Sequence, residues 1–319
     1  MTPSAQGHGS PPDTPVREEA REATVCLAGG RRLGYAQYGD PHGRPLLYFH
    51  GISRLEARAF HDAANSLGIR IIAIDRPGMG LSDYARGRRL LDWPGDVLAV
   101  AEALGLDRFA VVGVSAGGPY AACCAYAIPE RLSGVGIVGG LAPPDADLRA
   151  QLNKHQRKQR SGMTMLGKLP VLTRLVAAVT ARQVRRPGGQ SEGMAAVDQA
   201  LIAERPAMGA AMAASFAEAF RGGTRGFAQD LRVFGTRSWG FAPESIATPV
   251  HLWHGELDEN VFVANGRHLA ATIPDCRAVF LPDEGHLLFA DHAHEILTAV
   301  APQALEPSPQ AQPGPSDVS

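Results

Sequence analysis

One stretch, residues 109–125, constrains the fold of this 319-residue chain more than any other. The apolar run at 109–112 predicts a short buried strand, and residues 119–125 predict a helix. Between them lies a Gly-x-Ser-x-Gly turn centred on Ser115. A strand, a serine turn and a helix in this order place the hydroxyl on a sharp bend at the edge of a sheet. The flanking glycines suit that bend, because side chains there would collide with the neighbouring strand and helix.

The chain around this stretch alternates between strands and helices. Four apolar runs predict strands, at 45–51, 70–75, 109–112 and 134–139. Helices are expected between them, at about 55–67, 93–104 and 119–125. Such alternation predicts a mostly parallel central sheet with helices on both faces. Two earlier runs, at 24–27 and 32–38, flank Gly29-Gly30 and predict a hairpin.

The alternation stops after residue 142 and resumes near residue 249. Residues 195–220 favour a helix with a break near Pro206, and no strand is expected between about 143 and 238. The sequence therefore predicts an inserted helical lid at 143–238 within a core at 23–142 and 239–304. The ends, 1–22 and 305–319, have the composition of disordered tails. In the second half, strands are expected at 249–255 and 277–281 and helices at 263–273 and 293–300.

Four predicted strand ends carry side chains suited to chemistry. These side chains are His50 (in a His-Gly pair with Gly51), Ser115, Asp258 and His286. Functional groups of such sheets gather at the carboxyl ends of the strands. Serine is a weak nucleophile that needs a base, a group that orients the base and donors for the oxyanion. The order Ser, Asp, His along the chain fits a nucleophile-elbow arrangement.

With these residues the chain resembles the α/β-hydrolase superfamily over about residues 24–304. It is most similar to the lidded group that includes esterases, proline iminopeptidase-like enzymes and carbon–carbon bond hydrolases. The resemblance also rests on the His50-Gly51 turn and on Asp-x-Pro-Gly-x-Gly-x-Ser at 75–82. It implies Ser115 as nucleophile, His286 as general base and Asp258 as the group that orients the imidazole.

The same resemblance implies an oxyanion hole made by the backbone N–H groups of Ala116 and Ile52. It assigns His50 and Gly51 to the loop that contacts substrate. In this chain the loop after Gly51 is shorter than in relatives, because Ile52 leads directly into Ser-Arg-Leu-Glu. Ile52 is therefore expected both to narrow the pocket and to supply the second N–H.

Other residues of the same types compete for these roles. Glu256 lies two residues before Asp258 and is expected to face solvent. His254, directly before a glycine, is expected to be structural. His251 and His268 also compete with His286, whereas His292 and His294 are expected to be solvated on the first turn of the last helix.

The predicted lid has an uneven charge distribution. Residues 149–187 contain ten Lys or Arg and no Asp or Glu, interleaved with a Met-rich apolar stretch at 163–172. Three interpretations remain open. The segment is a solvated helical cover, it faces an anionic substrate, or it touches an anionic membrane surface weakly.

We therefore expect a serine hydrolase that cleaves a carboxylic ester or lactone of a small to medium acyl substrate. The same triad on a peptide, thioester or carbon–carbon bond is the enzymatic alternative, and a non-catalytic small-molecule receptor is the alternative of another class. No cofactor and no metal is implied. A net charge of −1 gives no case for nucleic acid. The four cysteines have no disulfide or metal spacing, and no signal peptide is expected, which favours the cytoplasm.

Overall fold

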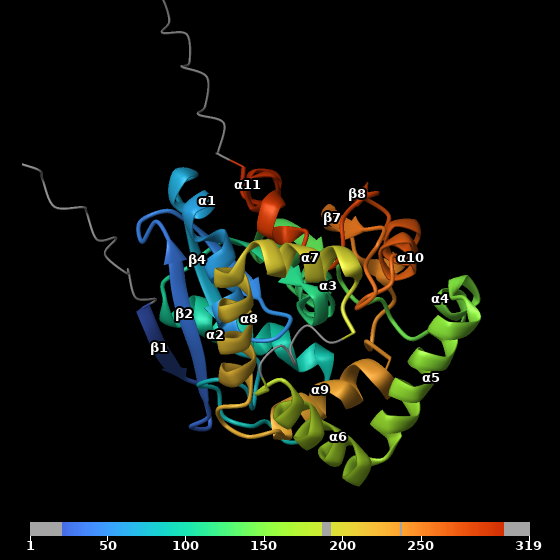
Figure 1. Cartoon of the computed structure of the whole chain (residues 1–319). Coiled ribbons are helices and arrows are strands. Elements are labelled where there is room, and N and C mark those ends of the chain that lie inside the picture. Colours follow the sequence, from blue (N-terminus) through green and yellow to red (C-terminus); the bar gives the residue numbers. More distant parts are fainter. Residues whose placement is uncertain (1–20, 187–192, 237, 303–319) are drawn as a thin grey trace, which may run out of the picture.

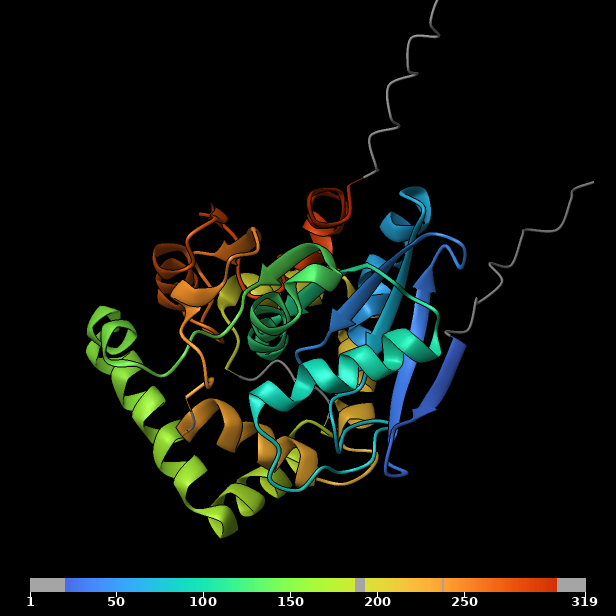
Figure 2. The same ribbon diagram turned by 180° about the vertical axis from the view of Figure 1, so that it is seen from behind.

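An eight-stranded sheet forms the centre of the computed structural model, which describes residues 21–186, 193–236 and 238–302 (Figures 1 and 2). The strand order is β1-β2-β4-β3-β5-β6-β7-β8. The six strands β3 to β8 all run parallel to one another, whereas β2 is antiparallel to its neighbours β1 and β4. The strands are β1 Arg21–Cys26, β2 Arg32–Gly39, β3 Arg44–Phe49, β4 Ile69–Ile74, β5 Phe109–Val114, β6 Leu132–Val138, β7 Val250–Gly255 and β8 Cys276–Leu281. The predicted mostly parallel sheet is confirmed.

Side chains of the central strands alternate between two cores, one on each face of the sheet. In β5, Phe109 and Val111 belong to one core, whereas Ala110 and Val112 belong to the other. Because both faces are covered, the strand is apolar throughout. The first face is covered by α2 Trp93–Ala103, α3 Gly118–Ala127 and α10 Ala264–Thr272, and the second by α1 His61–Ser66 and α11 Phe289–Val300.

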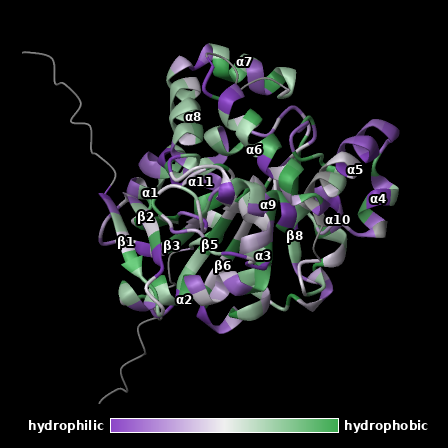
Figure 3. Ribbon diagram, turned by 90° about the horizontal axis from the view of Figure 1, so that it is seen from below, coloured by the Kyte–Doolittle hydropathy of each residue, from purple (hydrophilic) through white to green (hydrophobic). Residues whose placement is uncertain are grey.

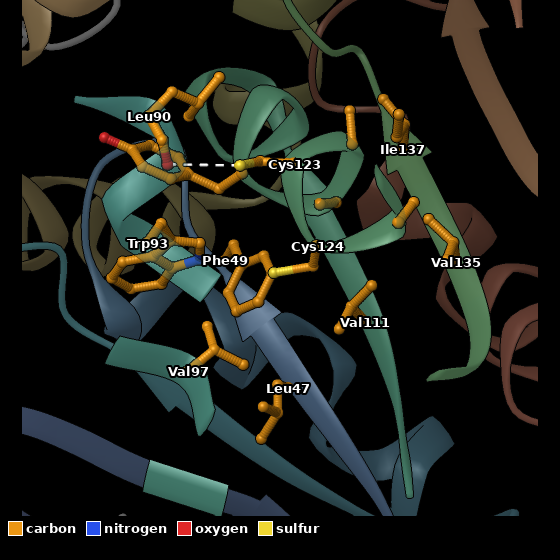
Figure 4. Packing of buried hydrophobic residues seen from close by; sticks show 14 of the residues in the cluster. Leu47, Phe49, Leu90, Trp93, Val97, Val111, Cys123, Cys124, Val135 and Ile137 are labelled. Atoms are coloured by element: carbon orange, nitrogen blue, oxygen red, sulfur yellow. Dashed lines mark hydrogen bonds between the residues drawn. The ribbon is translucent and has the colours of Figure 1, made fainter. Parts of the chain in front are cut away.

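Helix α3, which follows Ser115, packs into the first core. Cys123 and Cys124 of α3 are fully buried in the cluster that also contains Phe49 and Trp93 (Figure 4). The Cys123 thiol donates to the Leu90 carbonyl at 3.3 Å. Helix α3 is therefore fixed against the sheet, and with it the turn at its beginning.

Within the described residues, six α-helices lie between β6 and β7, where the sequence predicts a helical insertion. They are α4 Ala146–Gln151, α5 Lys154–Lys168, α6 Pro170–Gln183, α7 Ala196–Glu204, α8 Pro206–Ala219 and α9 Arg225–Thr236. The break near Pro206 separates α7 from α8, because proline has no N–H to continue the first helix. Helices α7 and α8 lie over the sheet, while α5, α6 and α9 form a separate group (Figure 1). We call residues 143–238 the insertion; that they form a domain of their own stays a prediction.

Two buried arginines of the core hold the insertion in place. Arg54 pairs with Asp75 at 2.6 Å and with Glu218 of α8 at 2.7 Å. The Nε of Arg76 donates to Asp230 of α9 at 2.8 Å. These ion pairs are shielded from water, so they join α8 and α9 firmly to the loops beside the sheet.

The structure differs from the sequence prediction at several element boundaries. The helix expected at 55–67 begins as a 3₁₀ helix, η1 Arg54–Phe60, and continues as α1. The last helix begins at Phe289 rather than at residue 293. The predicted N-terminal tail overlaps β1, since Glu22 pairs with Ala36 in the sheet. Residues 1–20 and 303–319 lie outside the described residues, so the tails stay predictions there. The other 3₁₀ helices are η2 Leu90–Asp92, η3 Ser115–Gly117, η4 Pro129–Arg131 and η5 Pro243–Ser245.

Candidate active site

Ser115 is the only non-glycine residue of the described chain with a positive φ, which is 55°. It directly follows β5 and is the first residue of η3, as the sharp turn predicts. The backbone is packed too closely on both sides for other side chains. A Cβ at Gly113 would come within 2.3 Å of the Gly117 oxygen, and one at Gly117 within 1.9 Å of the Phe49 oxygen. The strained conformation of a serine at such a place is a feature of functional sites.

Asp258 and His286, from loops after β7 and β8, lie together beneath this turn. The Nδ1 atom of His286 is 2.7 Å from Oδ2 of Asp258. The other carboxylate oxygen accepts the backbone N–H groups of Asn260 and Val261, each at 2.8 Å. Asp258 is therefore held in one orientation, and it in turn orients the imidazole of His286.

The electrostatics of this pair suit a base that carries charge during a reaction. Burial alone would raise the pKa of Asp258, but the charge of His286 and hydrogen bonds from His254 and His286 hold it below its usual value. Burial alone would lower the pKa of His286, but the Asp258 carboxylate raises it above the usual 6.5. The negative charge of Asp258 thus stabilises the imidazolium form of His286.

Ser115 and His286 line one cavity of about 360 Å³ between the sheet and the insertion. Its walls are mostly apolar, and α8 contributes Met208 and Met212. No hydrogen bond joins the Ser115 hydroxyl to His286 within the described structure. Hydrogen bonds between catalytic groups are often long before substrate binds and shorten in the complex. The cavity could hold a small or medium apolar acyl group beside Ser115.

The backbone N–H of Ile52 already has an acceptor in the structure. Oε1 of Glu56 accepts it at 2.6 Å, and Oε2 accepts the N–H of Gly51 at 2.8 Å. Glu56 lines the same cavity as Ser115 and is the one acidic side chain among the described lining residues. Burial raises the pKa of the Glu56 carboxyl, although both N–H groups and Arg76 oppose this shift. The oxyanion role of Ile52 therefore stays a prediction, and it requires that Glu56 give up this N–H.

The position of Glu56 has a local signal in the sequence. Ser53 and Glu56 form the Ser-x-x-Glu pattern of a helix start, in which the glutamate returns to backbone N–H groups before the helix. The Ser53 hydroxyl accepts the N–H of Leu55 at 3.3 Å, as expected of a capping residue. The glutamate reaches one and two residues further back than usual, to Ile52 and Gly51.

Arg76 holds the same loop from its carbonyl side. Its guanidinium donates to the carbonyls of His50 and Gly51, the latter at 3.0 Å. The ring of His50 accepts the Arg76 backbone N–H at 3.1 Å, and burial lowers its pKa well below 6.5. Gly51 lines the cavity, but the fully buried His50 is not among the lining residues. That His50 contacts substrate stays a prediction. In the structure its buried ring instead accepts the backbone N–H of Arg76.

Asp198, a buried carboxylate of the insertion, lies against the His286 loop. It accepts the backbone N–H groups of His286 at 3.0 Å and Leu287 at 2.9 Å. A Cβ at Gly285 would come within 2.4 Å of its Oδ1. Asp198 therefore fixes the loop that carries the candidate base.

The competing residues Glu256 and His254 do not line the cavity that Ser115 and His286 share. Glu256 pairs with Arg267 at 2.7 Å on the surface, as its expected solvent-facing position requires. His254 is fully buried, lies 3.5 Å from Asp258 and approaches the Val261 oxygen at 2.6 Å. Within the described residues there is no group of three or more potential His, Cys, Asp or Glu metal ligands. No helix in the described part of the chain is long and apolar enough to cross a membrane.

Comparisons with known proteins show the family to which the chain belongs. Residues 44–293 match the model of the α/β hydrolase fold family, so this chain belongs to that family. A serine hydrolase-like protein of Danio rerio is 33% identical over 127 residues, which is 38% of each chain. A proline iminopeptidase of Xylella fastidiosa is 32% identical over 114 residues, 34% of this chain and 36% of that protein. The matches thus span little more than a third of either relative.

Solved structures share the fold over nearly the whole chain. The enol-lactonase of Burkholderia xenovorans LB400 superposes with a TM-score of 0.64 at 18% identity, covering 86% of this chain and all of that one. This likeness establishes the fold, while the chemistry must be argued from the site.

Proposed function

We propose that this chain is a serine hydrolase that cleaves a carboxylic ester or lactone through an acyl-enzyme on Ser115. One observation carries the proposal: a strained serine and an aspartate-oriented histidine line the same apolar cavity. His286 would take the Ser115 proton as the hydroxyl attacks the acyl carbon. It would then return that proton to the leaving alcohol, and repeat both transfers with water.

The Ala116 N–H would be the first oxyanion donor, because it follows the nucleophile at the start of a helix. One such preorganised donor is worth about 3 kcal/mol in the transition state. The apolar walls and the volume of the cavity favour a small to medium acyl group. The name of the lactonase neighbour is compatible with a cyclic ester, and the buried free thiols of Cys123 and Cys124 suit the reducing cytoplasm.

Amide cleavage after an N-terminal residue is less well supported. A substrate amine would need a free carboxylate near Ser115. Glu56 and Asp198 are each engaged by two backbone N–H groups, and Glu218 is engaged by Arg54. An ester or lactone needs no such partner, so we place it first.

The test is active-site labelling together with a substrate series. A fluorophosphonate probe should modify the wild-type protein and leave Ser115→Ala unmodified. p-Nitrophenyl esters of increasing chain length should be hydrolysed until the acyl group outgrows the cavity. Proline p-nitroanilide tests the peptidase alternative in the same assay. Labelling of Ser115 without turnover of any acyl substrate would favour a binding protein instead.

A further inference from the structure

The two backbone N–H groups that face the cavity from the His50 loop are occupied by an internal carboxylate. Glu56 accepts from Gly51 at 2.8 Å and from Ile52 at 2.6 Å, with one oxygen for each N–H. A Cβ on Gly51 would lie 2.9 Å from Ser115 Cβ and 3.4 Å from Glu56 Oε2. The carboxylate is therefore beside the nucleophile, on the side where the second oxyanion donor is predicted.

A negative charge at this place opposes the proposed reaction. The tetrahedral intermediate develops a negative oxygen that must lie close to Ala116 and Ile52. An ionised carboxylate on the Ile52 N–H both occupies that donor and repels the new charge. A substrate oxygen can use Ile52 only after Glu56 has moved or lost its charge.

We propose that Glu56 is an internal competitor for the oxyanion site, an inference that rests on the proposed function. In the resting protein its carboxylate holds the Ile52 N–H. The substrate carbonyl oxygen takes over this N–H when Glu56 turns into the cavity. There Arg58 lines the same space and offers the displaced carboxylate a cation. Arg205 lines this space too, but its guanidinium is paired with Asp291 at 2.6 Å.

Two further observations fit this role. Arg76 fixes the carbonyls of His50 and Gly51, so the loop keeps its shape when Glu56 leaves. The raised pKa of the Glu56 carboxyl means that burial disfavours its charged form at this place. Burial thus makes the ionised carboxylate less stable at this place. This cost limits the net free energy that its hydrogen bonds to Gly51 and Ile52 contribute.

The experiment compares Glu56→Gln and Glu56→Ala with wild type in two assays. One is kcat/KM for p-nitrophenyl acetate, and the other is the rate of inactivation by a fluorophosphonate, which also places an oxygen in the oxyanion site. Glutamine keeps the shape but has no charge and a single acceptor oxygen. Both rates should rise by at least about fivefold, because the competent state becomes more populated. Glu102→Gln on an exposed part of α2 is the matched control and should leave both rates unchanged.

The outcomes separate this proposal from the proposed function. Unchanged or reduced rates in Glu56→Gln, with thermal unfolding like that of wild type, would show that Glu56 acts as a helix cap alone. Failure of the wild type to react with the probe at all would instead remove the proposed function. Glu56→Gln keeps the test decisive if Glu56→Ala disturbs the loop.

A second, independent observation concerns the outer face of helix α6. Its buried side carries small residues, Thr173, Ala177 and Ala181, whereas its exposed side carries large apolar ones. The exposed fractions are 81% for Val171, 59% for Leu175 and 57% for Val179. Figure 3 shows apolar and polar segments side by side along this helix. The large apolar side chains thus point away from the protein.

Positive charge accompanies this apolar face. Arg174 and Arg182 are exposed and lie on the same side of α6 by helical spacing. Residues 149–186 contain no acidic side chain at all. A second copy meeting this face would bring arginine against arginine. We infer that the outer face of α6 (Val171, Arg174, Leu175, Val179 and Arg182) docks on an anionic lipid surface.

Vesicle sedimentation tests this surface. The full chain should bind vesicles of phosphatidylcholine mixed with phosphatidylglycerol, and bind phosphatidylcholine alone much more weakly. Binding should be lost when Val171, Leu175 and Val179 are changed to Ser, and reduced by Arg174→Gln with Arg182→Gln. Arg277→Gln, an exposed arginine of β8, is the control. Equal binding to both vesicles, no binding, or a dimer abolished by the serine variant would overturn the inference.

Discussion

Asp198 of helix α7 accepts the backbone N–H of His286 at 3.0 Å, so the insertion fixes the loop that carries the candidate base. The same carboxylate accepts the N–H of Leu287 at 2.9 Å. Asp198, His286 and Leu287 are all buried, so these hydrogen bonds are shielded from solvent. The position of His286 therefore depends on a residue 88 positions earlier in the chain.

Asp198→Asn should reduce kcat by about tenfold, with a smaller change in KM, because the His286 loop loses its precise placement. One amide group would face the two N–H donors, so stability should fall by about 1–3 kcal/mol. Steady-state kinetics and urea unfolding measure the two effects. Glu204→Gln, exposed on the same helix, should behave like wild type. Wild-type kcat in Asp198→Asn would show that the loop is held without it.

Asp258→Asn should lower kcat by about 10³ to 10⁴-fold and shift its pH dependence. The reaction needs neutral His286, so its rate rises with pH through the pKa of that ring. The Asp258 charge raises this pKa against the effect of burial. Without that charge the pKa falls, and the acidic limb of kcat/KM should move to lower pH. Glu256→Gln in the same loop should leave the limb in place; an unmoved limb in Asp258→Asn would assign it to another group.

Gly117→Ala should destabilise the protein by about 2 kcal/mol or more, because its Cβ would come within 1.9 Å of the Phe49 oxygen. Gly95→Ala is the matched control, since Gly95 is an exposed helical residue with nothing within 4 Å of its Cβ. It should stabilise α2 by about 0.5–1 kcal/mol. Urea unfolding of both variants measures the contrast. Equal stability would mean that the strand–helix packing at Gly117 can relax.

These predictions also indicate what the sequence could and could not provide. The sheet was predictable, because β3, β4 and β5 are apolar on both faces and are separated by helix-length segments. The turn at Ser115 was predictable, because strand, glycines and helix all fall within one local stretch. Contacts across long separations were not. No local pattern around Asp198 predicts its contact with His286. The pattern around Glu56 predicts a helix start, but not that its carboxylate lies in the cavity beside Ser115.

The oxyanion prediction illustrates the same limit. Sequence order places Ile52 correctly in the loop after His50, and the loop does border the cavity. Which way its N–H points depends on Glu56 and Arg76 together. Those two residues come from different elements, and their meeting is a property of the packed structure.

Arg54→Met should destabilise the protein by about 3–5 kcal/mol, because it leaves the fully buried Asp75 without its cation. Burial already raises the pKa of Asp75 to about 6, with Arg54 opposing this shift. Without Arg54 the folded-state pKa rises further above the unfolded value. The folded protein binds this proton more tightly than the unfolded chain does. The resulting contribution to the free energy of unfolding is present at low pH and is lost as pH rises through the folded-state pKa. The deficit of the variant should therefore grow from acidic to neutral pH.

Urea unfolding at several pH values measures this dependence. Arg32→Met is the control, because Arg32 and Asp83 form an exposed pair that contributes little to stability. A deficit that does not vary with pH would mean that Asp75 keeps its charge by recruiting another partner.

The arginine pairs that join core and insertion also set an order of events during synthesis. Arg54 and Arg76 belong to the first quarter of the chain, whereas Glu218 and Asp230 are made after two thirds of it. Until those residues leave the ribosome, the loop at His50 and Gly51 lacks the Asp230 carboxylate that positions Arg76. The nascent sheet can form earlier, but the cavity beside Ser115 takes its shape only when the helices of the insertion have been translated.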